Sequence, residues 1–100
     1  MAQQDRVGAH ATKIHQHGEN TYITYWSTDV VAFDSKWIML RHGGWMTPTT
    51  KTRMNQAARQ FSLGYTVYQK AGQWYATTPK NDTVPFGPEG WVAFSRNPAI

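Results

Sequence analysis

The sequence contains no cysteine, which excludes disulfide bonds and thiolate metal sites. It also has no apolar run near the roughly 18–20 residues that a membrane-spanning helix needs. The first twenty residues lack the basic-then-apolar layout of a secretory signal peptide. We therefore expect an intracellular protein without a membrane anchor, although a chain without cysteine also tolerates an oxidising compartment.

Acidic residues are missing from the middle of the chain. No Asp or Glu lies between Asp34 and Asp82. The same interval contains seven basic residues: Lys36, Arg41, Lys51, Arg53, Arg59, Lys70 and Lys80. The net charge of +4 is therefore concentrated in this interval, which predicts a surface that binds an anion. The alternative is a solvated basic surface that only maintains solubility.

Sequence motifs of the common enzyme classes are lacking as well. There is no G-x-S-x-G, P-loop or G-x-G-x-x-G motif, and the six carboxylates show no paired spacing for acid–base catalysis. His15 and His17 share a strand face, and His10 and His42 could lie nearby, but a structural zinc site needs four ligands and a catalytic site usually three. We therefore expect no enzyme activity, no metal and no other cofactor.

What the sequence does contain is enough apolar surface for one domain. Of its 100 residues, 40% are apolar and 14% aromatic, which indicates a folded chain with one core. We expect a flexible N-terminus over residues 1–9 and a single domain over residues 10–100.

Alternating β-branched and aromatic residues predict a series of short strands. Four precede residue 48, at residues 11–16, 21–27, 29–33 and 37–41, and a hairpin follows at residues 65–78. The short connections favour antiparallel pairing. The predicted class is α+β, with an antiparallel sheet of about five to six strands in the order ββββ-α-ββ, packed against one helix. The path of residues 79–100 stays open, with a short edge strand at 83–86 and a segment at 91–94 that closes the sheet or crosses the core.

The helix is predicted by apolar residues at i, i+3, i+4 and i+7, namely Met54, Ala57, Ala58 and Phe61. We place it at residues 48–63. Thr47 can serve as the N-cap and Pro48 suits the first helical position, where its missing N–H costs nothing. Gly64 lies where a left-handed residue is expected to end the helix.

The start of this predicted helix carries cations and no acid. Lys51 and Arg53 lie in its first turn and a half, where the helix dipole ordinarily attracts Asp or Glu. The hydroxyl of Thr50, its neighbouring threonines and the free backbone N–H groups belong to the same turn, and such donors bind phosphate or carboxylate. Our hypothesis is that a ligand supplies the missing negative charge. The alternative is that the threonines only cap the helix while the basic side chains point into water.

The remaining candidates extend this surface along the helix and the neighbouring loops. Lys51, Asn55 and Arg59 form an i, i+4, i+8 row, and such side chains contact base edges or phosphates. Exposed rings beside cations stack single-stranded bases, although most of the rings are expected in the core. The predicted nucleic-acid-binding or partner-binding residues are Arg41, Trp45, Thr50, Lys51, Arg53, Asn55, Arg59 and Lys70.

Several motifs carry a resemblance. They are T-D-V-V at residues 28–31, GGW-x-T-x-TTK-x-RMNQ at residues 43–56 and QWY at residues 73–75. In this combination the chain resembles, over residues 20–78, a group of short proteins encoded by tailed bacteriophages. The resemblance implies a phage genome and action in the host bacterial cytoplasm. It implies no catalytic residue.

Three functions agree with these patterns. The first is a nucleic-acid-binding accessory protein that uses the start of the helix and its flanking loop. The second is an inhibitor or adaptor that binds an acidic surface of a host protein, such as a defence or transcription factor. The third is a minor virion or assembly component that forms a homo-oligomer through sheet edges. Since fold does not dictate function, the sequence leaves all three open.

Overall fold

The structure, a computed structural model, describes residues 11–44 and 46–96. The expected flexible segment 1–9 lies outside these residues. Within them the chain forms one helix, α1 (Pro48–Gln60), and eight strands. The strands are β1 (Thr12–His17), β2 (Asn20–Tyr25), β3 (Thr28–Phe33), β4 (Trp37–Arg41), β5 (Thr66–Lys70), β6 (Gln73–Thr77), β7 (Thr83–Pro85) and β8 (Trp91–Ser95). The predicted α+β class is confirmed, and no helix in the described ranges is long and apolar enough to cross a membrane.

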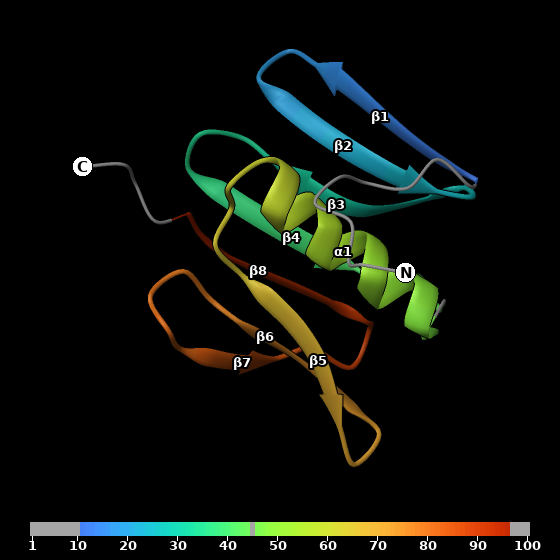
Figure 1. Cartoon of the computed structure of the whole chain (residues 1–100), viewed down its shortest axis with the longest axis vertical. Coiled ribbons are helices and arrows are strands. Elements are labelled where there is room, and N and C mark those ends of the chain that lie inside the picture. Colours follow the sequence, from blue (N-terminus) through green and yellow to red (C-terminus); the bar gives the residue numbers. More distant parts are fainter. Residues whose placement is uncertain (1–10, 45, 97–100) are drawn as a thin grey trace.

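Five strands form one antiparallel sheet in the order β1-β2-β3-β4-β8. The first four follow one another through short turns, and β8 returns to pair with β4 in a register that places Phe94 opposite Ile38. Segment 91–94 therefore closes this sheet, which was one of the two predicted alternatives. Figure 1 shows α1 lying across one face of the sheet.

The two faces of the five-stranded sheet differ in what lies on them. On the face under α1, which we call the covered face, Ile23, Val31 and Leu40 are fully buried. On the opposite face, which we call the open face, every described strand residue is at least partly exposed. Strand β3 buries both Val30 and Val31 because the register shifts there, and a β-bulge breaks the alternation of sides.

Helix α1 begins as predicted and ends earlier than predicted. Thr47 is the N-cap, with its Oγ1 accepting from the Thr50 N–H at 3.3 Å, and Pro48 occupies the first turn. The helix ends at Gln60 instead of residue 63, because Ser62 takes the left-handed conformation with φ +54° and the Leu63 N–H bonds the Ala58 carbonyl. This pairing closes the last turn before Gly64 is reached.

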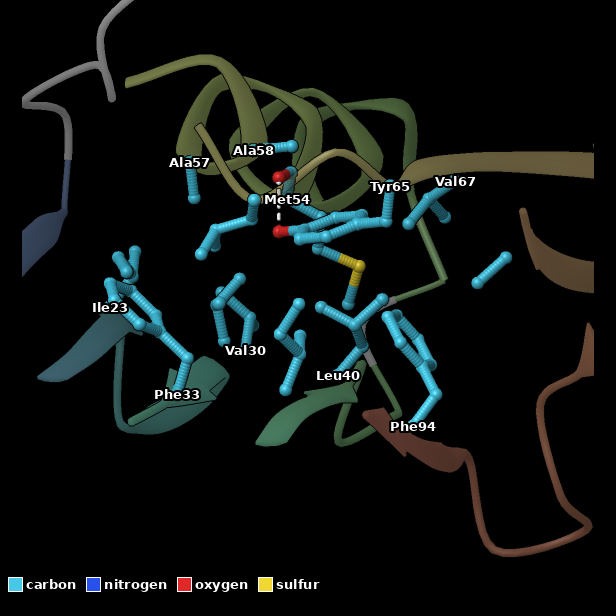
Figure 2. Packing of buried hydrophobic residues seen from close by; sticks show 14 of the residues in the cluster. Ile23, Val30, Phe33, Leu40, Met54, Ala57, Ala58, Tyr65, Val67 and Phe94 are labelled. Carbon is cyan, nitrogen blue, oxygen red and sulfur yellow. Dashed lines mark hydrogen bonds between the residues drawn. The ribbon is translucent and has the colours of Figure 1, made fainter. Parts of the chain in front are cut away.

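The core lies between α1 and the covered face (Figure 2). Met54 and Ala57 of the helix face Ile23 and Leu40 of the sheet, and all four side chains are fully buried. The Tyr65 hydroxyl donates to the Met54 carbonyl at 2.6 Å inside this layer, and burial raises the pKa of that hydroxyl above its usual range. The predicted apolar helix stripe is therefore confirmed as the core side of α1.

Strands β5, β6 and β7 form a separate three-stranded antiparallel sheet beside the first (Figure 1). The sequence predicted one sheet, and the structure divides the strands between two. Helix α1 bonds the edge of this second sheet through Asn55: Nδ2 donates to the Val67 carbonyl at 3.0 Å and Oδ1 accepts from the Val67 N–H at 2.8 Å. Segment 83–85 is the short strand predicted near 83–86.

Candidate nucleic-acid interface

The first turn of α1 does not present the hydroxyl that the sequence suggested. The Thr50 side chain is fully buried, and its hydroxyl lies 3.2 Å from the Thr47 Oγ1. Thr50 therefore has a structural role in the helix cap, and the structure does not support its prediction as a surface-binding residue. A buried hydroxyl that is already paired cannot reach a ligand outside the molecule.

Lys51 and Asn55 both turn toward the second sheet. The Lys51 Nζ donates to the Gln69 Oε1 at 2.9 Å and lies 5.4 Å from the centre of the Trp74 ring. The Asn55 amide uses both its donor and its acceptor on the Val67 backbone. The structure therefore does not support the prediction that Asn55 contacts bases, because its side chain already bonds β5.

Arg53 turns the other way, toward the first two strands. Its Nε donates to the Thr12 Oγ1 at 3.0 Å, one of its terminal nitrogens donates to the Gln56 Oε1 at 3.2 Å, and its guanidinium lies 5.9 Å from the centre of the Tyr25 ring. Two positions along a helix differ by about 200°, so Lys51 and Arg53 lie on different sides. The structure therefore does not bring these two cations together into one anion site.

The remaining candidates are distributed over the molecule. Arg59 is exposed in the last turn of α1, and Lys70 is exposed where β5 ends. Trp45 lies outside the described residues. Arg41 is exposed at the end of β4 and pairs in register with Trp91 of β8. Of the predicted residues, Arg41 is the one whose register places it on the open face of the five-stranded sheet.

The open face carries a band of rings and small side chains, which we call the open-face strip. One row across four strands consists of Tyr22, Ala32, Met39 and Ala93, which are neighbours in register. Trp37 and Trp91 lie on the same face at opposite ends of the β4–β8 pair. We define the strip by these six residues.

The two tryptophans of the strip are left uncovered. Trp37 is 56% exposed and Trp91 is 45% exposed, although large rings are ordinarily well buried. Because Trp91 pairs with Arg41, four positions beyond Trp37, the two rings are separated by about 13 Å along the strands. An uncovered pair of rings on one face of a small domain is typical of a binding surface.

A shallow hollow of about 280 Å³ lies between Tyr22 and Trp37. The small side chains of Ala32 and Ala93 leave room there, and Asn20 and Asp34 lie on its lining. The remaining lining residues are Met39 and two residues whose side chains lie on the covered face, Phe33 and Ile38. The hollow is therefore apolar with two polar groups, the usual composition of a small ligand site.

The carboxylate of the hollow is held in place by the turn before β4. The Asp34 Oδ1 accepts from the backbone N–H groups of Lys36 at 2.7 Å and Trp37 at 2.8 Å. These bonds, followed by the charges of Lys36 and Arg96, lower the pKa of Asp34, so it is ionised near neutral pH. Arg96 donates to the Asp34 carbonyl oxygen at 2.7 Å, which adds a second cation beside the same turn.

A polar chain adjoins the strip at β1 and β2, where His15 pairs in register with Tyr22 and the two rings stack with centres 5.2 Å apart. The Thr24 hydroxyl donates to Asp29, and the His15 Nε2 lies 3.1 Å from the same hydroxyl oxygen and 3.9 Å from the Asp29 carboxylate. Because the hydroxyl donates to the carboxylate, the imidazole does not act as its base, and the arrangement differs from a nucleophile–histidine–acid triad.

The other histidines do not join this chain. His42 is 8% exposed and packs against Trp74 and Phe86, with ring centres 5.2 Å and 5.9 Å away. His17 is exposed in β1, and His10 lies outside the described residues. Residues 11–44 and 46–96 contain no group of three or more side chains positioned as ligands for a metal ion.

Sequence reasoning missed the open-face strip. Its signal lies in the alternation of β4, where Trp37, Met39 and Arg41 occupy one face while the buried Ile38 and Leu40 occupy the other. That pattern places a large ring on the side away from the core, but it does not show that the opposite face lacks a cover. Which face of the sheet is covered depends on where α1 packs, and this is a property of the tertiary structure.

Comparison with known protein families identifies a match. The family model described as Kyanoviridae Gp96 protein matches residues 1–93, so the chain belongs to that family. The predicted resemblance to proteins of tailed bacteriophages is thereby confirmed. No curated protein matches the chain, and no solved structure matches it.

Proposed function

We propose that this member of the Kyanoviridae Gp96 family binds single-stranded nucleic acid on the open face of its five-stranded sheet. One observation carries the proposal: Trp37 and Trp91 are half exposed on a sheet face that no described element covers. Exposed rings on a sheet stack unpaired bases, and each stacked base contributes about 1–3 kcal/mol. Duplex DNA keeps its bases stacked inside, so it cannot use such rings.

Cations beside the strip support an anionic partner. Arg41 pairs in register with Trp91, and Lys36 precedes Trp37 in the chain; both side chains are exposed. Neither forms an ion pair with a carboxylate in the described part of the chain. A phosphate backbone that crosses the strip would therefore meet one cation at each tryptophan.

In this proposal the protein acts in the cytoplasm of the infected bacterium, as a binding protein without enzyme activity. An acidic surface of a host protein is the second candidate, because tryptophan and arginine are also the residues that dominate protein–protein interfaces. Nuclease treatment distinguishes the two partners. If a host protein from lysate stays bound after nuclease treatment, the partner is a protein. If the bound material is lost after nuclease treatment, the partner is a nucleic acid.

The direct test is the affinity for labelled single-stranded and duplex oligonucleotides of equal length, measured by fluorescence anisotropy at 50 and 200 mM salt. Two phosphate contacts on a single strand predict an affinity loss of about sevenfold over this range. Quenching of tryptophan fluorescence should accompany binding, because the rings stack on bases. Affinity that does not change with salt, or equal affinity for the duplex, would overturn the proposal.

A further inference from the structure

The hollow between Tyr22 and Trp37 has the dimensions and walls of a site for one flat ring. Its volume of about 280 Å³ lies just below the roughly 300–1,000 Å³ of pockets that bury drug-sized molecules. Its lining includes the small side chains of Ala32 and Ala93 and two aromatic residues on strands separated by β3: Tyr22 of β2, which pairs with Ala32, and Trp37 of β4. A single base separated from its neighbours has this flat, apolar form.

Two polar residues, Asn20 and Asp34, line the hollow. The Asp34 Oδ1 already accepts two backbone N–H groups, whereas its Oδ2 forms no hydrogen bond within the described residues. An ionised carboxylate oxygen can only accept a hydrogen bond. The Asn20 side chain also forms no hydrogen bond with a described residue, so its amide can both donate and accept.

We propose that this hollow holds one unstacked base that carries an exocyclic amino group, with Asp34 accepting from that group and Asn20 contacting the adjacent ring edge. The inference rests on the proposed function, since it names the base that the open face prefers. Carboxylates accept from the amino group of cytosine in known recognition geometry. Uracil and thymine place a carbonyl oxygen at the same position, which an ionised carboxylate repels.

The charges around Asp34 make this arrangement compatible with a nucleic acid. A carboxylate alone would repel the phosphate backbone. Lys36 and Arg96 both lie close enough to Asp34 to act on its charge, and neither is paired with another carboxylate in the described ranges. The phosphates on either side of the bound base are therefore expected to meet these two cations, while the carboxylate faces the base.

The test compares oligo-dC with oligo-dU, because cytosine and uracil differ only in the group at C4 and the protonation of the neighbouring nitrogen. The unmodified protein is expected to bind oligo-dC roughly 5- to 100-fold more tightly than oligo-dU, the usual range for one specific base contact. Matched oligo-rC and oligo-rU distinguish DNA from RNA as the source of the base. Equal affinity for the C and U strands would overturn the base site but leave the proposed function standing, whereas no binding to any strand would overturn both.

The variant Asp34→Asn sharpens the test. The amide oxygen can still accept from the Lys36 and Trp37 N–H groups, so the turn is retained, but the free atom becomes a donor. Asp34→Asn should bind oligo-dC and oligo-dU with about equal affinity, or should prefer oligo-dU. A preserved C preference in a variant with unchanged circular dichroism would overturn the assignment of Asp34.

A second variant covers the case in which Asp34→Asn does not fold. Ala93 is exposed on the open face, so Ala93→Leu fills the hollow from β8 without entering the core. It is expected to lower the affinity for oligo-dC to that for oligo-dU. An unchanged affinity for oligo-dC would show that the base does not enter the hollow and would overturn the inference.

Discussion

The two faces of the five-stranded sheet are built from the same strands, but large side chains are buried on one face and exposed on the other. On the covered face, Ile23 and Leu40 are fully buried beneath α1, and the Tyr65 hydroxyl is satisfied by a backbone carbonyl. On the open face, Trp37 and Trp91 remain about half exposed. Because burying such rings would stabilise the fold by a few kcal/mol, a surface that leaves them exposed is better explained by binding than by folding.

The cations follow the same division. Lys51 and Arg53, which the sequence singled out, are partly buried and contact neutral groups of the same chain: the Gln69 and Thr12 side-chain oxygens and the faces of nearby rings. The acid that the helix lacks is therefore replaced by amide, hydroxyl and aromatic groups. Arg41, whose register places it beside Trp91, has no such partner among residues 11–44 and 46–96.

The largest expected effect comes from removing the two rings of the open face. Trp37→Ala combined with Trp91→Ala should weaken binding to a single strand by at least about 30-fold, since each lost stacking contact costs about 1–3 kcal/mol. Both rings are about half exposed, so the free energy of unfolding should fall by no more than about 2 kcal/mol, less than the roughly 3–5 kcal/mol lost when one fully buried Trp is truncated. Anisotropy titration and urea denaturation of the same samples measure the two quantities.

Trp26→Ala is the matched control for the double variant. Trp26 is 57% exposed, like the strip tryptophans, but it lies in the turn between β2 and β3. Its replacement should leave the affinity within about twofold, because a residue outside the contact contributes little. A loss of affinity as large as that of the double variant would move the binding surface from the sheet face to its end.

The next effect concerns the packing behind the sheet, at Gly90. Gly90 has φ +86°, and a Cβ there would lie 2.5 Å from the His42 Cε1. Gly90→Ala should therefore lower the free energy of unfolding by about 2–4 kcal/mol through the combined strain and overlap. Gly72→Ala is the control, because Gly72 has φ +82° with no atom within 4 Å of the added Cβ. Gly72→Ala should lower the free energy of unfolding by only about 1 kcal/mol. Equal losses of stability for the two variants in urea denaturation would contradict the close packing of Gly90 against His42.

A pair of Asn→Asp substitutions separates the two faces with the same chemical change. Asn55→Asp removes the donor to the Val67 carbonyl and should destabilise the fold by about 1–3 kcal/mol, with the strip unaffected. Asn20→Asp should leave stability nearly unchanged but weaken binding severalfold, since it adds a negative charge to the hollow. Thermal melting and anisotropy on both variants test this, and the reverse pattern would show that α1 carries the binding surface.

These contrasts show which features the sequence could predict. The period of Met54, Ala57 and Ala58 identified the buried side of α1, and Thr47 and Pro48 identified its start, because both signals are local. The division into two sheets was not predicted, because strand pairing depends on contacts between segments that are distant in the sequence, such as β4 and β8. Short alternating strands do not specify which sheet they join.

The candidate site was harder to predict for the same reason. Arg41 was identified from charge, and the structure places it beside the strip. Thr50 and Asn55 were chosen from chemistry that suits a ligand, but the fold uses both groups internally. A polar side chain in a sequence does not reveal whether its partner is another part of the chain. Trp37 is exposed because no element of the described ranges packs on the open face of β4, and no local sequence pattern encodes this.

The smallest expected effect is a pH dependence of stability that comes from the buried His42. Burial against Trp74 and Phe86 lowers the pKa of His42 below its usual value near 6.5, and its Nδ1 accepts from the Gly44 N–H at 3.1 Å, which requires that nitrogen to be unprotonated. Below about pH 6.5 the unfolded chain binds this proton and the folded chain resists it. The free energy of unfolding should therefore fall as the pH is lowered from 7.5 to 5.5, by at most about 1.4 kcal/mol for each pH unit.

Replacing the imidazole isolates this contribution. His42→Gln should be less stable at pH 7.5 and should lose part of the pH dependence, while the exposed His15 and His17 contribute equally to both proteins. Urea denaturation at the two pH values gives the difference in slope. Single-strand affinity should keep the same pH dependence in both proteins, because His42 packs against the second sheet and not on the open face. Identical stability slopes would show that His42 does not titrate between folded and unfolded states, and a change confined to affinity would place it at the binding surface.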